Sequence, residues 1–402
     1  MFEHTSHSRT DSYACPESSH RESFPLSMQN SADVFIVGGG PAGLAFAISA
    51  AQGGLRVVVA DHCRPPIDKA CGEGLMPDTV QALNTLGIIF ADGEGVPFRG
   101  IRFCDANGRA SVQADFGKGF GVGLRRTALH AKLAQRAKQL GVTLLWGSRI
   151  NYSDRKRIFC EGKPVQSKWV IGADGEASRF RKWAGFEATR YEHIRFSTRQ
   201  HFQIAPWSDF AEVYWARGCQ VVVAAVASDE VCVAATSRNP LLRFHEAVSE
   251  IPALVRRLRG VNPTNPVRGT RAPFRRLRRV CHGRFALIGD ASGSVDPLTG
   301  EGIGLAFKQG AALANAITRG DLQSYQAAHN SFCRVPRLIS RLMLMMDAYP
   351  HLRDRALRML AAEPSLFSRL LNVNVGNLTL LDFGLPHALR LGWRIVSPPW
   401  EL

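Results

Sequence analysis

The sequence lacks the marks of several protein classes. No apolar run approaches the roughly 20 residues that a membrane-spanning helix needs, and residues 1–31 contain no apolar core of a signal peptide. The nine cysteines are dispersed, with no C-x-x-C pair and no His/Cys cluster at zinc spacing. These absences predict a cytoplasmic protein with reduced thiols and no bound metal. Residues 1–31 are expected to be a disordered leader, and Met28 is an alternative start.

Acidic residues are also scarce. The 402 residues include 34 Asp and Glu against 50 Lys and Arg, which gives a formal net charge of +16. Hydrophobic residues make up 45% and charged residues 21%, which excludes a wholly disordered chain, a collagen-like chain and a small disulfide scaffold. The length predicts about two or three domains. The excess positive charge raises the question of an anionic partner.

Much of that excess lies in one segment. Residues 251–284, here called the arginine-rich segment, contain ten arginines and no Asp or Glu. One interpretation is a solvated basic face. A second is attraction of an anionic partner, such as the phosphates of NAD(P)H, a carrier-bound substrate or a membrane surface. Nucleic acid is the least favoured partner, because no helix-turn-helix, RRM or zinc pattern accompanies the arginines.

The first chemistry-bearing pattern is a strand, a glycine-rich turn and a helix. Residues 32–37 are an apolar run typical of a buried parallel strand, and residues 38–43 read G-x-G-x-x-G. In such a turn Gly38 permits the tight bend, Gly40 lets the backbone approach a pyrophosphate, and Gly43 lets the helix pack on the strand. The following helix would present its positive end to the pyrophosphate.

A second strand, residues 55–60, ends at Asp61. A carboxylate at that place can accept hydrogen bonds from the hydroxyls of a ribose. The order of strand, glycines, helix, strand and acid therefore predicts a dinucleotide site. It does not decide between NAD and FAD.

Two later patterns have the same form. Residues 168–171 read as a strand that runs into Gly172-Ala173-Asp174-Gly175, and residues 284–288 read as a strand that runs into Gly289-Asp290-Ala291. Residues 296–304 then read D-P-L-T-G-E-G-I-G and lead into a helix over residues 305–317. An acid at a strand end can bind the hydroxyls of an extended polyol, and a glycine run lets the backbone approach a flat ring.

The three patterns in this order resemble the FAD-dependent monooxygenase and geranylgeranyl-reductase-like superfamily, which has the p-hydroxybenzoate-hydroxylase-type fold. The likeness covers roughly residues 32–330. It implies an α/β FAD-binding Rossmann-type domain, with a mixed sheet and helices, interleaved with an α+β antiparallel-sheet substrate domain. A helical C-terminal tail follows. NAD(P)H would serve as a transient reductant, because the sequence has one dinucleotide fingerprint.

The resemblance also implies residue roles. Asp290 should hold the FAD ribitol, the backbone of residues 300–304 should line the isoalloxazine, and Arg126 of an R-x-x-L pattern should contact FAD. Asp174 and Arg181 belong to a motif used for cofactor binding and core architecture. The expected cofactor-binding residues are Gly38, Gly40, Gly43, Asp61, Cys71, Gly72, Arg126, Asp174, Asp290, Pro297, Gly300, Gly302 and Ile303.

Residues 69–74, K-A-C-G-E-G, resemble a loop that lies next to the flavin in geranylgeranyl-reductase-like proteins. Cys71 is either a functional thiol or a small buried residue, and Glu73 is either a proton donor or a solvated carboxylate. The reductases' Y-x-W-x-F-P-K segment is not recognisable, and the halogenases' W-x-W-x-I-P is missing, so halogenation is not expected. No catalytic residue is assigned.

The expected domains alternate along the chain. The FAD domain takes residues 32–94, 121–185 and 283–330, and the substrate domain takes residues 95–120 and 186–282, with strands near 218–227 and 230–236. Residues 331–402 form the helical tail, in which residues 335–359 are an amphipathic cap or a membrane-surface helix.

These expectations lead to an FAD-dependent oxidoreductase. The first hypothesis is NAD(P)H- and O2-dependent hydroxylation or epoxidation of a hydrophobic secondary metabolite. The second is reduction of isoprenoid double bonds. The third is a non-catalytic flavin-holding accessory protein. The location is expected to be cytoplasmic, with peripheral attachment to a membrane as an alternative.

Overall fold

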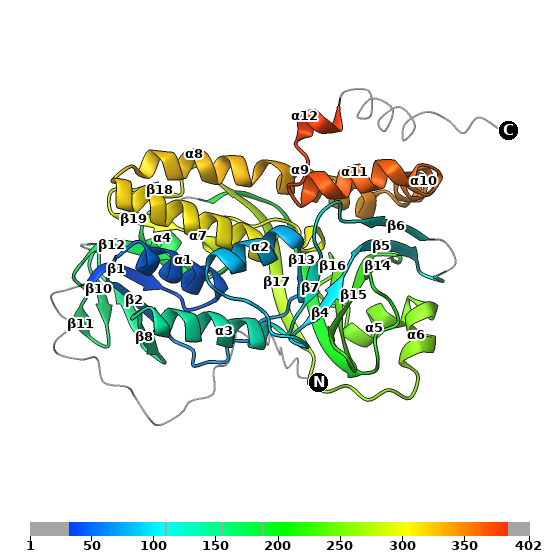
Figure 1. Ribbon diagram of the computed structural model, residues 1–402, viewed down its shortest axis with the longest axis horizontal. Coiled ribbons are helices and arrows are strands. Elements are labelled where there is room, and N and C mark those ends of the chain that lie inside the picture. Colours follow the sequence, from blue (N-terminus) through cyan, green and yellow to red (C-terminus); the bar gives the residue numbers. More distant parts are fainter. Residues whose placement is uncertain (1–31, 109–110, 155, 187, 385–402) are drawn as a thin grey trace, which may run out of the picture.

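The computed structural model describes residues 32–108, 111–154, 156–186 and 188–384. The expected leader and Met28 lie outside the described residues. Figure 1 shows two lobes, each built on a sheet, with helices α8 and α11 along one side of the pair. The fold is the expected one: a mixed sheet with helices, a largely antiparallel sheet, and a helical C-terminal region.

The first lobe contains a six-stranded sheet of order β18-β19-β12-β1-β2-β8. Five of its strands run parallel, and β18 pairs antiparallel with β19. The apolar runs of β1 and β2 are almost wholly buried, as expected for parallel strands. The strands are β1 (Ala32–Val37), β2 (Val57–Asp61), β8 (Thr143–Trp146), β12 (Ser167–Gly172), β18 (Cys281–His282) and β19 (Phe285–Leu287).

Three long helices pack on this sheet, and α1 contacts both of the others. They are α1 (Pro41–Gln52), α3 (Arg126–Gln139) and α7 (Gly302–Arg319). A short ribbon of β9 (Ile150–Tyr152), β10 (Ile158–Cys160) and β11 (Lys163–Pro164) packs on helix α4 (Arg179–Trp183). The rings of Tyr152, Phe180 and Trp183 carry that contact.

The second lobe contains a seven-stranded sheet of order β17-β13-β16-β15-β14-β5-β6, in which the pair β14–β5 is parallel. The strands are β5 (Gly100–Asp105), β6 (Ser111–Asp115), β13 (Ala188–Gln203), β14 (Ala211–Trp215), β15 (Cys219–Ala227), β16 (Glu230–Ser237) and β17 (Arg268–Leu277). One face packs on the C-terminal helices through Phe103 and Trp215. The other packs on α5 (Phe244–Ser249) and α6 (Pro252–Leu258) through Cys104 and Tyr214.

A small sheet joins the lobes. It has the order β3-β7-β4, with β3 (Gly74–Leu75), β7 (Gly121–Gly123) and β4 (Val96–Phe98). A side chain on Gly123 would meet the carbonyl oxygen of Ala225 in β15 at 1.7 Å, so this glycine permits close contact between the lobes. Strands β3 and β7 of this sheet come from the expected FAD domain, and β4 comes from the expected substrate domain. The domain limits stay a prediction.

The C-terminal region consists of consecutive helices. They are α8 (Leu322–Phe332), α9 (Arg334–Ala348), α10 (Pro350–Ala362), α11 (Pro364–Asn374) and the short α12 (Leu380–Phe383). The amphipathic stretch 335–359 is therefore divided, because Pro350 begins a new helix. Within the described ranges, no helix combines the length and apolar character needed to cross a bilayer. The cytoplasmic location stays a prediction.

A buried ion cluster fastens these helices to the rest of the molecule. Arg195 of β13 is 1% exposed, and its Nη1 lies 3.1 Å from Oδ2 of Asp296, in the loop before α7. Asp347 of α9 lies 3.9 Å from Arg195 and accepts a 2.8 Å hydrogen bond from Gln220 Nε2. Burial raises the pKa of the Asp296 carboxyl, and Arg195 opposes that shift. Asp347 also pairs with Arg238 at 2.7 Å, so Arg195 is the close cation of Asp296 and lies at the junction between the loop before α7 and helix α9.

Substitution Arg195→Met should lower the free energy of unfolding by about 3–5 kcal/mol, because it leaves the buried Asp296 carboxylate without its cation. Urea unfolding followed by circular dichroism measures this. The control is Arg56→Met, which breaks an exposed pair with Asp33 and should change the urea midpoint little. Equal losses in both variants would contradict the role given to the cluster.

Candidate functional site

The carboxyl ends of four parallel strands bring the sequence motifs to one edge of the first sheet. Val37 pairs with Ala60 and with Gly172, and Gly172 pairs with Leu287. The glycine turn, Asp61, Asp174 and Asp290 follow these strand ends directly. Ligands of open α/β sheets bind at this edge.

The three fingerprint glycines meet different surroundings. A side chain on Gly43 would lie 1.9 Å from the carbonyl oxygen of Gly38, and one on Gly38, where φ is +109°, would lie 2.4 Å from that of Ala173. These two glycines are required for packing. A side chain on Gly40 would meet no described atom within 4 Å. Gly40 therefore borders open space at the start of α1, where a pyrophosphate can approach the free N–H groups.

Asp61 holds the glycine turn in place. Its Oδ2 accepts a 2.6 Å hydrogen bond from the Gly39 N–H, and its Oδ1 accepts one of 2.8 Å from the Cys63 N–H. His130 of α3 donates from Nε2 to the Gly39 carbonyl at 2.9 Å, and burial lowers the pKa of its imidazole. Both carboxylate oxygens thus accept backbone N–H groups, and contact with a ribose stays a prediction.

Asp174 lies in the loop before helix α4, whose N-cap is Ser178. Its carboxylate accepts hydrogen bonds from the Ser178 hydroxyl and, at 3.0 Å, from the Phe180 N–H. Arg181 donates from Nη1 to the carbonyl of Ala291 at 3.1 Å, so the middle motif supports the turn that carries Asp290. The contacts of Asp174 in the described structure are architectural, and a direct contact with the cofactor stays a prediction.

Asp290 faces two cations. Lys69 lies 2.8 Å away through its Nζ, and it lowers the pKa of the Asp290 carboxyl, with a smaller contribution from Arg126. The Nε of Arg126 is buried and has no hydrogen-bond partner in the described part of the chain. A buried donor without a partner is rare in native proteins, so it fits a polar group of a bound cofactor.

The expected ring-binding residues lie at the start of α7. Pro297 begins a turn that ends at Gly300, where φ is +69° and a side chain would lie 2.2 Å from Met76 Cε. A side chain on Gly302 would meet no described atom within 4 Å, and Ile303 is half-buried behind it. The first N–H groups of α7 have no partners within the helix, which suits negative charge on a flat ring.

Glu301, at the same helix start, is 1% exposed. Burial and the nearby Asp78 raise the pKa of its carboxyl to about 8. Its Oε1 accepts a 3.3 Å hydrogen bond from Asn374 Nδ2 of α11. Burial thus favours the protonated form of Glu301, which connects the start of α7 to the C-terminal helices.

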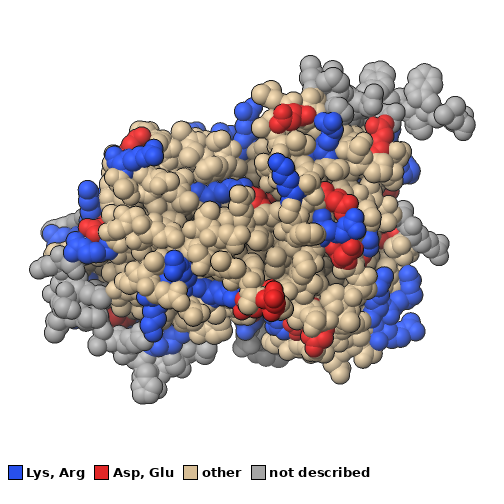
Figure 2. Space-filling view, viewed as in Figure 1, with Lys and Arg blue, Asp and Glu red and all other residues tan. Residues whose placement is uncertain are grey.

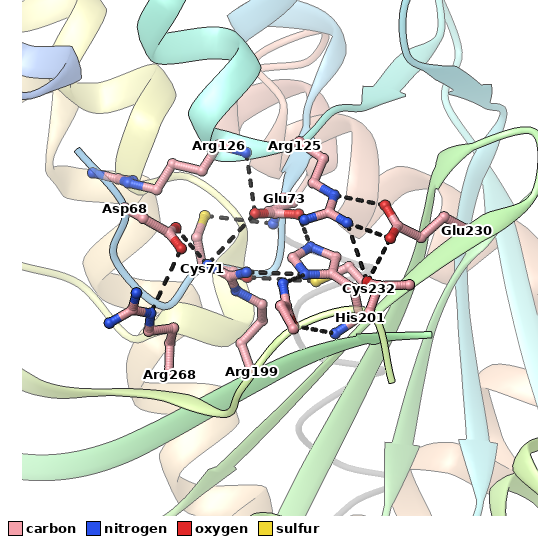
Figure 3. Close-up of polar contacts among 12 residues, drawn as sticks. Asp68, Cys71, Glu73, Arg125, Arg126, Arg199, His201, Glu230, Cys232 and Arg268 are labelled. Atoms are coloured by element: carbon pink, nitrogen blue, oxygen red, sulfur yellow. Dashed lines mark hydrogen bonds and ion pairs between the residues drawn. The ribbon is translucent and has the colours of Figure 1, made fainter. Parts of the chain in front are cut away.

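Glu73 occupies the centre of a buried network between the two lobes (Figure 3). Its Oε1 accepts from the Arg126 backbone N–H at 3.1 Å, and its Oε2 lies 2.6 Å from His201 Nε2 in β13. Arg199 approaches Glu73 at 3.9 Å and donates to Asp68 at 2.5 Å. Glu73 is therefore a buried, fully partnered residue, and the expectation of a solvated carboxylate is wrong.

The hydrogen bonds of His201 fix its tautomer. Its Nδ1 lies 3.0 Å from Arg199 Nη1 and 2.6 Å from Asn265 Nδ2. Both of these nitrogens are hydrogen-bond donors. The backbone N–H of His201 donates to Asn265 Oδ1, which fixes the orientation of that amide. Nδ1 is therefore the acceptor, and Nε2 carries the proton that is donated to Glu73.

This tautomer affects whether the cluster around His201 could bind a metal ion. Glu73, His201 and Cys232 have ligand atoms within 4.8 Å of one another. A metal on Nε2 would move the ring proton to Nδ1, against the two donors that already face it. The hydrogen bonds therefore oppose a metal at this cluster.

Cys71 lies at the edge of the network and is half-buried. Its Sγ accepts from the Glu73 N–H at 3.4 Å, and its carbonyl oxygen accepts from the Cys232 thiol at 3.6 Å. The neighbouring Gly72 faces Val222 of the second sheet. The loop is thus held on both sides, and the choice between a functional and a structural thiol stays open.

Sequence reasoning missed Lys69 as the partner of Asp290, and it missed Arg199 and His201. The available signal was the pattern of β13, where Arg195, Arg199 and His201 fall on alternate positions and therefore on one face of the strand. Charged residues on a buried face indicate a polar site.

These features fit FAD: an open glycine turn, an acid at a strand end, an unpartnered arginine nitrogen and an open helix start. The chain belongs to the FAD-binding domain family, whose model matches residues 31–320. This membership confirms the expected class, a flavoprotein of the FAD-dependent oxidoreductases.

Known proteins of both expected branches are similar to the chain. Menaquinone reductase of Mycobacterium tuberculosis (strain H37Rv) is 28% identical over 74% of this chain and 79% of its own length. The 6-methylpretetramide 4-monooxygenase of Streptomyces rimosus is 26% identical over 87% of this chain and 93% of its own. A geranylgeranyl bacteriochlorophyll reductase-like structure from Thermoplasma acidophilum has a TM-score of 0.64 at 20% identity, covering 91% and 96% of the two chains.

Substitution Gly40→Val should leave the protein folded but free of FAD, because the side chain enters open space that the pyrophosphate requires. Visible flavin absorbance after purification and thermal unfolding measure the two effects. The control is Gly269→Val in β17, where an added carbon meets Thr198 Cγ2 at an ordinary 3.9 Å. A yellow Gly40→Val protein would contradict the assignment of the turn.

Proposed function

We propose that the protein is an NAD(P)H- and O2-dependent FAD monooxygenase that hydroxylates or epoxidises a hydrophobic secondary metabolite. The carrying observation is that the carboxylates of the network between the lobes are matched by cations. Asp68 binds Arg199, Glu230 binds Arg125, and Asp290 binds Lys69. Groups arranged in this way orient a cofactor and a substrate, and they do not offer a free acid.

Monooxygenation suits such a site. FAD supplies the redox chemistry and the activation of oxygen when it is bound. The residues of the chain would then bind and orient the substrate and exclude water. Reduction of a carbon–carbon double bond differs, because it also needs a proton donor for the second carbon.

The surroundings favour an apolar substrate. Met76 and Leu298, from the loops on either side of the α7 start, join a hydrophobic cluster with the inner face of the second sheet and with helices α9–α11. Phe103, Trp215 and Phe367 belong to this cluster. A hydrophobic metabolite placed against it would be shielded from water. Similarity to the Streptomyces monooxygenase over most of both chains supports the same proposal.

Reduction of isoprenoid double bonds is the second candidate, and specific observations favour it. The Cys71 thiol lies in a loop that resembles that of geranylgeranyl reductases. Glu301, with its raised pKa, is a buried acid that could supply a proton. Similarity to a menaquinone reductase is consistent with this candidate.

Oxygen consumption distinguishes the candidates. The FAD-loaded protein, given NADPH or NADH, should consume O2 at least about tenfold faster when its substrate is present in a panel of phenolic, polyketide and isoprenoid compounds, because substrate binding commits the reduced flavin to oxygenation. Mass spectrometry should show a product heavier by one oxygen atom.

The same panel under anaerobic conditions is the control. Saturation of a double bond without O2 would overturn the monooxygenase and establish the reductase. If no compound is converted after the flavin has been offered NAD(P)H or reduced with dithionite, the result would support the accessory protein.

The role of Cys71 is tested by Cys71→Ser, with Cys232→Ser as the matched control. In a monooxygenase both variants should keep FAD and at least about half of the turnover, because oxygen transfer needs no thiol. A loss of turnover confined to Cys71→Ser, measured as kcat with bound flavin unchanged, would favour the reductase.

A further inference from the structure

A cavity lies on the face of the seven-stranded sheet that is turned away from the flavin edge. It measures about 440 Å3 and is lined by polar side chains of β5, β6, β14 and α6. Cys104 and Tyr214 line it, whereas their neighbours Phe103 and Val213 pack on the opposite face with the C-terminal helices. Because side chains alternate between the faces of a strand, the sheet separates this cavity from Glu73 and His201.

The floor of the cavity is a built polar site. Glu212 is 3% exposed, and its Oε1 lies 2.9 Å from Arg102 Nη1. Its Oε2 accepts hydrogen bonds of 2.8 Å from Trp207 Nε1 and from the Tyr214 hydroxyl. The charge of Glu212 is therefore already matched, and Arg102 is held rigidly at the cavity wall.

Two further arginines of α6 line the opposite wall. Arg256 donates from Nη2 to the Asn107 carbonyl at 3.2 Å, and the Arg257 guanidinium lies 4.8 Å from the centre of the Trp207 ring. Neither forms an ion pair with an acid in the described ranges. Figure 2 shows Lys and Arg side chains gathered at the edge of the molecule where α6 lies. The cavity thus holds cationic charge that no described acid neutralises.

The arginine-rich segment therefore has two parts. Arg275 of β17 is 1% exposed and binds Glu176 at 3.0 Å, so it supports the flavin lobe. Arg256 and Arg257 stand in α6 beside the cavity. The segment therefore does not form one basic face: Arg275 forms an internal ion pair, whereas Arg256 and Arg257 line the cavity.

We propose that this cavity binds a small molecule bearing a phosphate or diphosphate group. Guanidinium groups pair with phosphate oxygens through two parallel hydrogen bonds. Arg102 is held in place by the buried Glu212, and the exposed Arg256 and Arg257 can reach a ligand in the cavity from the α6 side. The concave shape favours a small ligand over an extended polyanion. The sheet separates this cavity from the flavin edge, so the proposal does not depend on the monooxygenase reaction.

Inorganic pyrophosphate serves as the probe, in isothermal titration at low ionic strength with the FAD-loaded protein, whose flavin site is already filled. The wild-type protein should bind one equivalent. The double variant Arg256→Gln/Arg257→Gln should bind at least about tenfold more weakly, because it loses charge-assisted hydrogen bonds.

The matched control is Arg278→Gln/Arg279→Gln, two exposed arginines from the same segment. This variant also removes two positive charges, but at a place away from the cavity. Its affinity for pyrophosphate should stay within about twofold of the wild type, apart from a weak salt-dependent effect. Flavin absorbance and thermal unfolding verify that both variants remain folded.

Three results would overturn the proposal. They are the absence of saturable binding in the wild type, equal weakening in both double variants, and binding to vesicles containing phosphatidylglycerol without binding of pyrophosphate. The third result would assign the arginines to a membrane surface. Because the readout is binding and not turnover, its failure is distinguishable from failure of the proposed reaction.

Discussion

The position of the Glu73 carboxylate is the constraint on which the site depends. This buried group accepts from the first N–H of α3 in one lobe and from His201 of β13 in the other. Glu73 itself adopts a left-handed backbone conformation, with φ of +57°, which is unfavourable for a residue with a side chain. The two hydrogen bonds offset that cost, and they hold the loop that carries Lys69 and Cys71. The loop, the flavin edge and the second sheet therefore share one anchor.

This anchor explains why the acids of the site are matched by cations. A carboxylate enclosed between two sheets loses its hydration, and a cation or several hydrogen bonds must replace it. Arg199, Arg125 and Lys69 do so for Asp68, Glu230 and Asp290. Among the described residues Glu301 forms no ion pair. Lys308, which opposes the rise in the pKa of Glu301, is paired with Asp78, so burial and Asp78 keep that pKa raised. Charge matching thus distinguishes the carboxylates that are paired with a cation from Glu301, whose pKa is raised.

Local patterns predicted the parts of the fold that depend on neighbouring residues. The strand β1 has the expected bounds, and the glycines, Asp61 and Asp290 follow strand ends as expected, because apolar runs and turn residues act over short distances. The pairs that complete the site were not predictable in this way. Lys69 and Asp290 are 221 residues apart, and Glu73 and His201 are 128 apart, so their contact depends on how the sheets are assembled. The cavity beside α6 is likewise a product of tertiary structure.

The distribution of positive charge also depends on the fold and cannot be derived from the composition. A net charge of +16 suggests one large anionic partner when it is considered as a total. In the folded chain Arg195, Arg199 and Arg275 are buried and neutralise internal acids, so part of the basic content is structural. The cations that are left without an acid matter more for recognition than the total does. Arg256 and Arg257 are of this kind, and they face a cavity, which is why the excess charge points to a small anion behind the second sheet.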